Sequence, residues 1–265
     1  MPFTEKYPIE TKYIPKPSRR RSGISIQKVR FLVAHDTGNP GSSANSNVQW
    51  YIDTCQTVEK DKVSSAHLFV DDHHIVECIT ALTGPPEKAW HVLYKKTKDN
   101  ELYGANANDA AIGVEYCYGG GIDAGKAYDR YVWLLAKLCY QFKLNPQTDV
   151  VGHFILDPER KTDPRTGLLA SGRTYQQLLL DVVTAYHSNI QGDAIAQPTV
   201  AKVKTAIPLN LRAHPNKSAT LVKTVPADTE LLYVDRTLTG EAVRGNSIWY
   251  KTQEGNWFWD GGLIH

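Results

Sequence analysis

The chain has 265 residues, of which 42% are hydrophobic and 22% are charged. These proportions are ordinary for a folded globular protein and exclude extensive disorder. The length predicts one large and one small domain. The formal net charge is only +2, which is too small an excess to indicate a nucleic-acid partner by itself.

Four cysteines are scattered along the chain without any CxxC pair, so the sequence predicts neither a zinc ribbon nor a dense disulfide framework. Residues 1–23 hold no apolar run typical of a secretion signal, and no segment is apolar over the length that a membrane span needs. We therefore expect a protein that is made in the cytoplasm without a classical export signal and without stable membrane association.

Short apolar and β-branched runs alternate with helical periodicity over the first two thirds of the chain. Strands are expected at residues 30–35, 67–71, 74–79, 111–117 and 149–153. Helices are expected at residues 46–56, 128–142 and 174–187, the last opening with Thr174 and Gln177 in capping-box spacing. Strands interleaved with helices indicate an α/β layer structure.

The periodicity stops at residues 188–200, where small polar residues predict a linker. Beyond it, short alternating strands and turn residues are typical of a small β-barrel. The sequence thus predicts a first domain of residues 1–187, a linker of residues 188–200 and an all-β domain of residues 201–265.

Three segments place polar side chains where predicted strands end: VAHDTGNP at His35, GVEYC at Glu115, and GHFILDPERKTDP from His153 to Asp163. Sites in α/β sheets gather at such ends. A lone histidine there is more often a core residue, but three such segments together indicate a site. Lys161 is two residues from Asp163, so in an extended stretch both side chains point to one side, back toward His153.

Two imidazoles and one carboxylate form a common catalytic zinc set, because they fill three tetrahedral positions and leave the fourth open to water. Zinc lowers the pKa of its water to about 7, so hydroxide is available at neutral pH. Glu115 would take the water proton and pass it to the leaving amine. Lys161 would stabilise the oxygen that becomes negative in the tetrahedral intermediate. This set predicts hydrolysis.

The ordered motifs HDTGNP, SSAHLFVDDHHIVE, AWH, IGVEY and GHFILDPERKTDP resemble those of the zinc-dependent N-acetylmuramoyl-L-alanine amidases over residues 25–187. That family also includes peptidoglycan recognition proteins and many phage endolysins. The resemblance implies a mixed central β-sheet flanked by helices and one catalytic Zn²⁺ ion. Carried over by motif, it implies His35, His153 and Asp163 as zinc ligands, Glu115 as the catalytic glutamate and Lys161 as the transition-state lysine.

Three further residues, His67, Trp90 and His91, fall on positions that resemble the substrate groove of that family. The alternative is core packing for Trp90 and surface exposure for the two histidines. The basic run at residues 19–21 could meet anionic wall polymers, but we expect it to be a solvated loop.

The C-terminal residues resemble a bacterial SH3-like wall-binding module through LNLRAHPNKSATLV, IWYK and NWFWDGGL. Aromatic side chains that do not all fit a small core tend to mark a ligand face. The alternative is that alternate residues, such as Trp257 and Trp259, point inward as core. The aromatic residues clustered in the final predicted strands are Trp249, Tyr250, Trp257, Phe258 and Trp259, and all but Phe258 are candidates for contact with the wall.

These resemblances imply an endolysin-like, monomeric amidase that binds peptidoglycan and no nucleic acid, and acts at the bacterial wall after release from the host cell. It would cut the amide between N-acetylmuramic acid and the first L-alanine of the stem peptide. One alternative is a cytosolic amidase that recycles soluble muropeptides and would need no wall anchor. A second is a recognition protein that binds peptidoglycan without cutting it, and a third is a toxin injected into competing bacteria.

Overall fold

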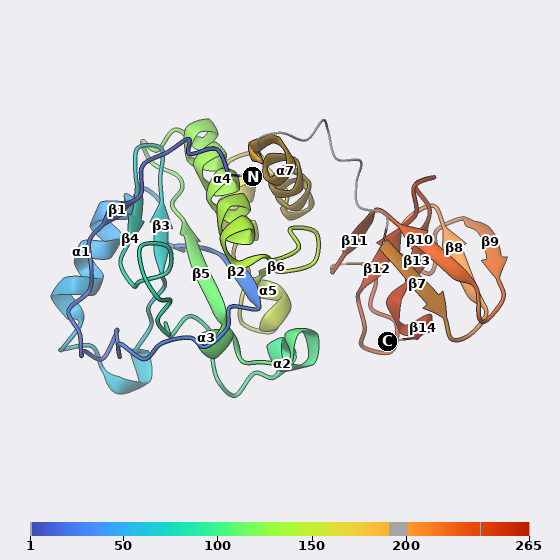
Figure 1. The fold of residues 1–265 in the computed structure, drawn as a ribbon, viewed down its shortest axis with the longest axis horizontal. Helices are drawn as coiled ribbons and strands as arrows, with labels where there is room; N and C mark the ends of the chain where they lie inside the picture. Colours follow the sequence, from blue (N-terminus) through green and yellow to red (C-terminus); the bar gives the residue numbers. More distant parts are fainter. Residues whose placement is uncertain (1, 191–200, 239, 265) are drawn as a thin grey trace. The chain divides into compact units, whose positions relative to one another are not determined.

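A computed structural model describes residues 2–190, 201–238 and 240–264, and the chain divides into two compact units, Met1–Gly192 and Asp193–His265 (Figure 1). Most of the expected linker lies outside the described residues. Its first two residues belong to helix α7 (Tyr175–Asn189), so the helix continues past residue 187, where we expected the domain to end.

Among the described residues, a six-stranded mixed sheet organises the first unit in the order β1-β4-β3-β5-β2-β6. Strands β3, β5, β2 and β6 run parallel, and β4 runs antiparallel to β3. The carboxyl ends of the four parallel strands therefore meet at one edge. The strands are β1 Glu10–Thr11, β2 Phe31–Asp36, β3 Leu68–Val70, β4 Ile75–Glu77, β5 Ala111–Tyr116 and β6 Val150–Gly152.

The longest helices begin at side-chain caps. Helix α4 (Ala124–Phe142) starts where Asp123 accepts from the Lys126 N–H, and α7 starts where Thr174 accepts from the Gln177 N–H. Helix α4 contacts α7 on one side and strands β2, β3 and β5 on the other, which buries its apolar stripe as expected. Helix α1 (Ala44–Thr54) packs on β3 and β4. The expected α/β architecture, a mixed sheet with flanking helices, is confirmed.

Several short elements are not evident from periodicity. They are α2 Lys98–Tyr103, α3 Ala107–Ala110, α5 His153–Leu156, α6 Arg165–Ala170 and the 3-10 turn η1 Lys60–Lys62. The strand expected at residues 149–153 ends at Gly152, and His153 begins α5 instead. This helix turns the chain sharply at the sheet edge. None of the helices in the described residues is apolar over a length that would cross a membrane.

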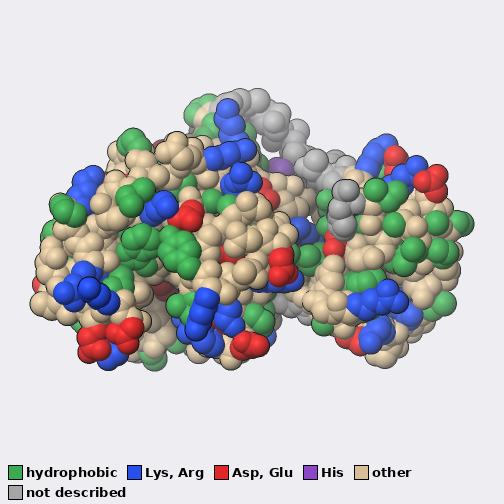
Figure 2. All heavy atoms as spheres, turned by 90° about the horizontal axis from the view of Figure 1, so that it is seen from below, with side chains coloured by type: hydrophobic (Ala, Val, Ile, Leu, Met, Phe, Trp, Pro, Cys, Tyr) green, Lys and Arg blue, Asp and Glu red, His purple; other side chains and the backbone are tan. Residues whose placement is uncertain are grey.

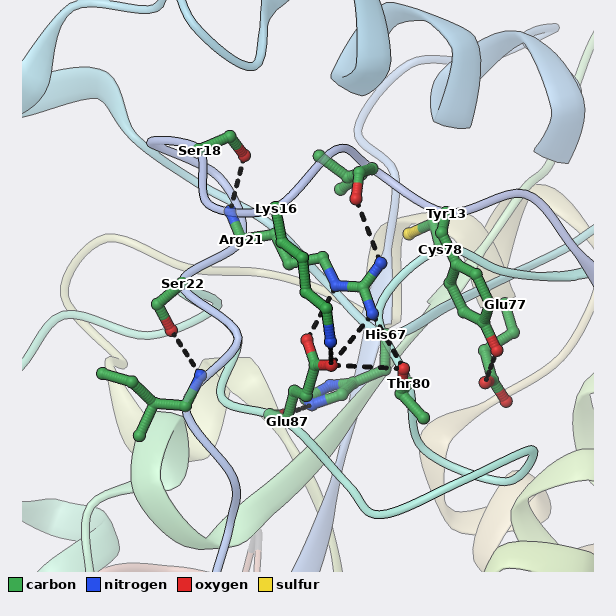
Figure 3. Close-up of polar contacts among 12 residues, drawn as sticks. Tyr13, Lys16, Ser18, Arg21, Ser22, His67, Glu77, Cys78, Thr80 and Glu87 are labelled. Atoms are coloured by element: carbon green, nitrogen blue, oxygen red, sulfur yellow. Dashed lines mark hydrogen bonds and ion pairs between the residues drawn. The ribbon is translucent and has the colours of Figure 1, made fainter.

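The basic run at residues 19–21 is not a solvated loop, and that expectation was wrong. Arg20 is fully buried and Arg21 is 4% exposed, while Arg19 is exposed. Arg21 forms a two-bond ion pair with Glu87, with Nε 2.7 Å from Oε2 and Nη2 2.9 Å from Oε1 (Figure 3). The Arg20 guanidinium lies over the rings of Trp50 and Tyr51, at 4.5 and 4.6 Å from their centroids. Both arginines thus pin the N-terminal segment to the domain.

The second unit is all-β apart from one 3-10 turn within its described residues, as expected. It has two sheets, ordered β10-β7-β14 and β11-β12-β13-β8-β9, with antiparallel pairs throughout. On the face drawn in Figure 2, positive and negative side chains are interspersed, in keeping with the small net charge. The elements are β7 Ala201–Thr205, β8 Leu209–Arg212, β9 Leu221–Val225, β10 Glu230–Tyr233, β11 Asp235–Thr237, β12 Trp249–Lys251, β13 Trp257–Trp259, η2 Asp260–Gly262 and β14 Leu263–Ile264.

Candidate metal centre and active site

Three residues that are far apart in the sequence converge at the carboxyl edge of the sheet. His35 lies near the end of β2, and His153 follows directly after the neighbouring parallel strand β6. Asp163 is brought back to them by a loop whose Asp163 carbonyl accepts from the Phe154 N–H at 3.0 Å. The Nδ1 atoms of His35 and His153 lie 2.8 and 3.0 Å from Oδ2 of Asp163. The sheet therefore assembles the three residues that the sequence nominated.

This cluster fits a tetrahedral metal ion. The three side chains belong to buried residues, and one ligand atom from each lies within 4.8 Å of the others. In a tetrahedral zinc site with bonds of 2.0–2.1 Å, neighbouring donor atoms are about 3.3 Å apart. The observed separations of 2.8 and 3.0 Å need only a small outward movement to reach that value. Two imidazoles and one carboxylate are also the donor types that zinc prefers.

The protonation states of the cluster suit metal binding. Burial lowers the pKa of His35 to about 4, so its ring is neutral at pH 7. Burial by itself raises the pKa of Asp163, but the hydrogen bonds to His153 and His35 outweigh it and hold that pKa well below its usual range. The site therefore offers a neutral imidazole and an ionised carboxylate, the forms in which these side chains coordinate a metal.

Glu115 lies beside His35, because β5 and β2 are neighbours and the two residues are partners in the strand register. Its Oε2 atom is buried and has no hydrogen-bond partner among the described residues. Burial, followed by the charges of Asp163 and Asp36, raises the pKa of Glu115 well above its ordinary value. The Lys161 ammonium lies 4.0 Å from Oδ1 of Asp163. The sheet edge thus carries a carboxyl group and a cation next to the candidate metal ligands.

A cleft of about 500 Å³ opens from Glu115 toward helix α1. Its lining combines serine, threonine and asparagine side chains with Trp50, Tyr51 and Phe69. The Trp50 side chain is 55% exposed, and the buried Arg20 guanidinium packs against its ring. Trp50 was not among the residues that the sequence nominated for the site. A bulky aromatic residue on the polar side of an amphipathic helix was the signal that could have indicated Trp50.

His67 does not line this cleft within the described chain, and it is not exposed either. Its ring is fully buried, with Nε2 2.8 Å from the Glu87 carbonyl oxygen (Figure 3). Nδ1 accepts from the Gly113 N–H at 3.0 Å. Burial lowers its pKa to about 4. With both ring nitrogens bonded to backbone, His67 holds β5 to the loop that carries Glu87.

Trp90 and His91 also lie outside the set of described residues that line the cleft. The Trp90 indole is half-buried and donates to the Arg19 carbonyl oxygen at 3.1 Å. His91 is only 7% exposed, so the alternative of surface exposure was wrong for it too. Its Nδ1 lies 3.0 Å from Nε2 of His35. His91 therefore faces the ring nitrogen of His35 that points away from Asp163.

The C-terminal aromatic residues do not form the exposed ligand face that we expected. Trp249, Tyr250, Trp257 and Phe258 are all buried, with at most 8% of each residue exposed, and Trp259 is half-buried. Tyr250 and Phe258 pair across β12 and β13 and belong to the apolar core of this unit. The alternative is confirmed in part, because Trp257 is buried while Trp259 is only half-buried, and Phe258 between them belongs to the apolar cluster.

Two of these tryptophans are covered by their own unit. The indole of Trp249 donates to the Glu241 carbonyl oxygen at 2.9 Å, and that of Trp259 donates to the Asn246 carbonyl oxygen at 3.0 Å. Close contacts with Gly240 and Gly261 leave no room there for a larger side chain. These bonds and contacts assign the tryptophans to the packing of the unit.

Comparison with known proteins agrees with this geometry. Residues 25–166 match the family described as N-acetylmuramoyl-L-alanine amidase. The chain is 28% identical over 200 residues to the N-acetylmuramoyl-L-alanine amidase BlyA of Bacillus subtilis (strain 168), a match that covers 73% of this chain and 51% of BlyA. It is 30% identical over 135 residues to the amidase CwlL of Bacillus licheniformis, covering 51% of this chain and 36% of CwlL. The chain thus spans about half the length of these relatives or less.

Solved structures share the fold. The catalytic domain of XlyA superposes with a TM-score of 0.52 at 23% identity, covering 66% of this chain and 99% of that domain. The Staphylococcus aureus hydrolase AmiA, solved in complex with its ligand, gives a TM-score of 0.53 at 20% identity, covering 69% and 85% of the two chains. Since the family match alone spans more than half of the sequence, this chain belongs to the N-acetylmuramoyl-L-alanine amidase family.

Proposed function

We propose that the protein is a zinc-dependent peptidoglycan amidase that hydrolyses the bond between the lactyl group of N-acetylmuramic acid and the first L-alanine of the stem peptide. One observation carries the proposal: two histidine Nδ1 atoms converge on one oxygen of Asp163, beside a buried carboxyl oxygen of Glu115 that lacks a partner among the described residues. The family membership and the names of the relatives support the same reaction.

The residues divide the work by chemical type. His35, His153 and Asp163 would hold the ion and leave one tetrahedral position open. Zinc bound there supplies Lewis acidity and makes a nucleophilic water available near neutral pH. Glu115 accepts the proton of that water and then donates it to the departing alanine nitrogen as the carbon–nitrogen bond breaks. Lys161, on the same side as Asp163, stabilises the negative charge that grows on the amide oxygen.

The cleft beside Glu115 suits a long polar substrate. Its hydroxyl and amide side chains match the hydroxyl and amide groups of a glycan that carries a peptide, and the exposed Trp50 adds an apolar surface to the lining. We therefore place the substrate along helix α1, with the scissile amide at Glu115.

We further propose that the second unit is an SH3-like module that holds the enzyme on the bacterial wall, as in an endolysin. Its compact all-β build supports this role. Since Trp249 and Trp257 are buried, the proposed binding surface involves other side chains of the unit. In this proposal the protein works as a monomer at the wall, with peptidoglycan as its partner.

The direct test is digestion of purified cell walls followed by assay of new N-terminal alanine. We expect release by the wild type, loss of release in chelator, and recovery when zinc is restored. The variant Glu115→Gln keeps the shape of the side chain but cannot accept the proton, so it should release almost nothing. Release that ignores both the chelator and this substitution would overturn the proposal.

A second comparison separates this function from its rivals. Full-length protein should act faster on intact walls than on soluble muropeptides, because the second unit concentrates it on the polymer. Preference for soluble fragments would favour a recycling amidase. Binding to walls without release of alanine would favour a recognition protein.

A further inference from the structure

We propose that His91 is a positioning residue for the metal centre: its Nδ1 accepts a hydrogen bond from Nε2–H of His35 and so directs Nδ1 of His35 at the metal. The two nitrogens are 3.0 Å apart, and the rings meet edge to face at 83°. The inference rests on the proposed zinc site and adds a residue that neither metal nor substrate would touch.

The proton positions follow from the geometry. A neutral imidazole has one N–H and one acceptor nitrogen. Nδ1 of His35 lies 2.8 Å from Oδ2 of Asp163, where it donates to the carboxylate as long as no metal is bound. A metal bound between them would need the lone pair of Nδ1, so in the zinc-loaded protein the proton of a neutral His35 ring lies on Nε2. The atom that faces Nε2 is Nδ1 of His91, which must then be the acceptor. Metal-binding histidines commonly donate their second N–H to a carboxylate, a carbonyl or water, and here another imidazole takes that place.

The backbone at His91 is fixed from several sides. Asn108 Oδ1 accepts from the N–H groups of His91 and Val92, at 2.9 and 3.0 Å. The preceding N–H, of Trp90, donates to the Ser65 hydroxyl at 2.9 Å. His91 is therefore presented to His35 on a rigid support.

The His91 ring packs against strand β5 at Gly113, where the strand has no side chain. A Cβ atom at Gly113 would lie 2.8 Å from Nδ1 and 2.9 Å from Cγ of His91, closer than side chains approach one another. Any larger residue would push the ring away from His35. The absence of a side chain at Gly113 thus allows the His91 ring to approach the His35 ring closely.

Core packing alone does not explain an imidazole at this position. Nε2 of His91 is buried and makes no hydrogen bond of good geometry among the described residues, although the ring also interacts with the Ala107 backbone. A weakly satisfied buried polar group is unfavourable for packing alone. An apolar side chain of similar size would avoid that cost. What the imidazole adds is the acceptor toward His35. His67, at the same depth, differs because backbone groups occupy both of its nitrogens.

The test is zinc affinity of the full-length protein, measured by competition with a chelator of known affinity. His91→Leu removes the acceptor and should weaken zinc binding by about 10- to 100-fold. His91→Asn keeps an oxygen close to the position of Nδ1 and should recover most of the affinity. The matched control is His74→Leu, which removes a partly exposed imidazole whose Nδ1 lies 2.7 Å from Glu10 Oε1 and should leave zinc affinity close to that of the wild type.

Nitrogen-15 NMR of the zinc-loaded wild type gives a measurement that needs no variant. We expect a proton on Nε2 of His35 and on Nε2 of His91, and none on Nδ1 of His91. A protonated Nδ1 on His91, unchanged zinc affinity in His91→Leu, or an equal loss in His74→Leu would each overturn the inference. If the wild type bound no zinc, both the proposed metal centre and this inference would be wrong. If it bound zinc but had no amidase activity, only the proposed reaction would be wrong.

Discussion

Two buried polar clusters in the first unit differ in how completely their atoms are paired. In the Arg21–Glu87 cluster, the Arg21 guanidinium donates to both oxygens of Glu87, to the Thr80 hydroxyl and to the Ile14 carbonyl oxygen (Figure 3). Lys16 adds a further bond to Glu87 at 2.7 Å. In the candidate metal centre, Nε2 of His153 and the neighbouring Oε2 of Glu115 are buried without a hydrogen-bond partner among the described residues.

The difference indicates what each cluster is for. Buried polar groups are nearly always hydrogen-bonded, so a saturated cluster is explained by the fold that it holds together. A cluster with unsatisfied buried atoms and shifted pKa values is typical of a site that completes its bonds with something from outside the chain. The two clusters should therefore respond to substitution in opposite ways, one through stability and the other through function.

The largest effect is expected at Glu115. The substitution Glu115→Gln should lower the rate of alanine release by about 10²- to 10⁴-fold, the contribution of a positioned acid and base. The free energy of unfolding should not fall, because the change replaces a carboxyl group whose buried Oε2 lacks a partner among the described residues. Release kinetics and urea unfolding of the same preparation check both halves. If Glu115→Gln lost stability but released alanine at the wild-type rate, Glu115 would belong to a structural cluster and not to a functional one.

Arg21→Met should do the opposite. It leaves Glu87 buried with only the half-exposed Lys16 as a charged partner, and breaking a buried ion pair in this way costs about 3–5 kcal/mol. Zinc affinity of the folded protein should stay unchanged. The control is Lys98→Met, which breaks an exposed pair with Glu101 and should cost no more than about 1 kcal/mol. If the two variants lost the same free energy of unfolding, the Arg21–Glu87 cluster would not stabilise the fold more than an exposed ion pair does.

We expect the free energy of unfolding of the first unit to fall at acid pH, because burial disfavours protonation of His67 in the folded state. The folded pKa is about 4 and the ordinary value is 6.5. Above pH 6.5 the ring is neutral in both states, so its full contribution to stability is present. As the pH falls from 6.5 to 4, the unfolded chain binds a proton that the folded protein does not, and stability drops by about 3 kcal/mol.

The measurement for His67 is urea unfolding in chelator across this pH range, which keeps zinc release out of the result. His67→Asn should be less stable at pH 7 but should show a flatter pH dependence than the wild type. If both proteins follow the same curve, other groups are responsible for the acid sensitivity.

The smallest expected effect is that of the metal on stability. Free zinc at about 100 times its dissociation constant should raise the free energy of unfolding by about 2.7 kcal/mol, because only the folded protein presents the site. Arg21→Met should keep this gain, and Asp163→Ala should lose it. Thermal or urea unfolding with and without zinc checks it. A gain that persists in Asp163→Ala would place the metal elsewhere.

Much of the metal centre was predictable because its residues follow locally recognisable strands. The apolar runs before His35, Glu115 and His153 have the length and composition of buried parallel strands, and the ends of such strands meet at one edge. The spacing of Lys161 and Asp163 predicted that both point back toward His153. The start of α7 was also readable, since a cap is a bond between residues three apart.

The errors share a cause. Arg21 looked solvated because its partner Glu87 lies 66 residues away, and no local pattern announces that pairing. His67 and His91 looked like groove or surface residues because their burial depends on loops that pack across β5. In the second unit, the register between β12 and β13 puts Tyr250 and Phe258 inside, whereas alternation alone left both faces of each strand equally eligible.

Order along the chain was enough to define the α/β class, the main strands and helices, and the five residues that meet at the candidate site. Only the tertiary structure decided whether a given polar side chain is hydrogen-bonded, buried without a partner, or exposed to solvent. The physical reason is that local periodicity reports backbone conformation and the face on which a side chain lies, while the partner of a buried charge or imidazole comes from a distant part of the chain. His91 is the clearest instance, since its neighbour His35 is 56 residues away.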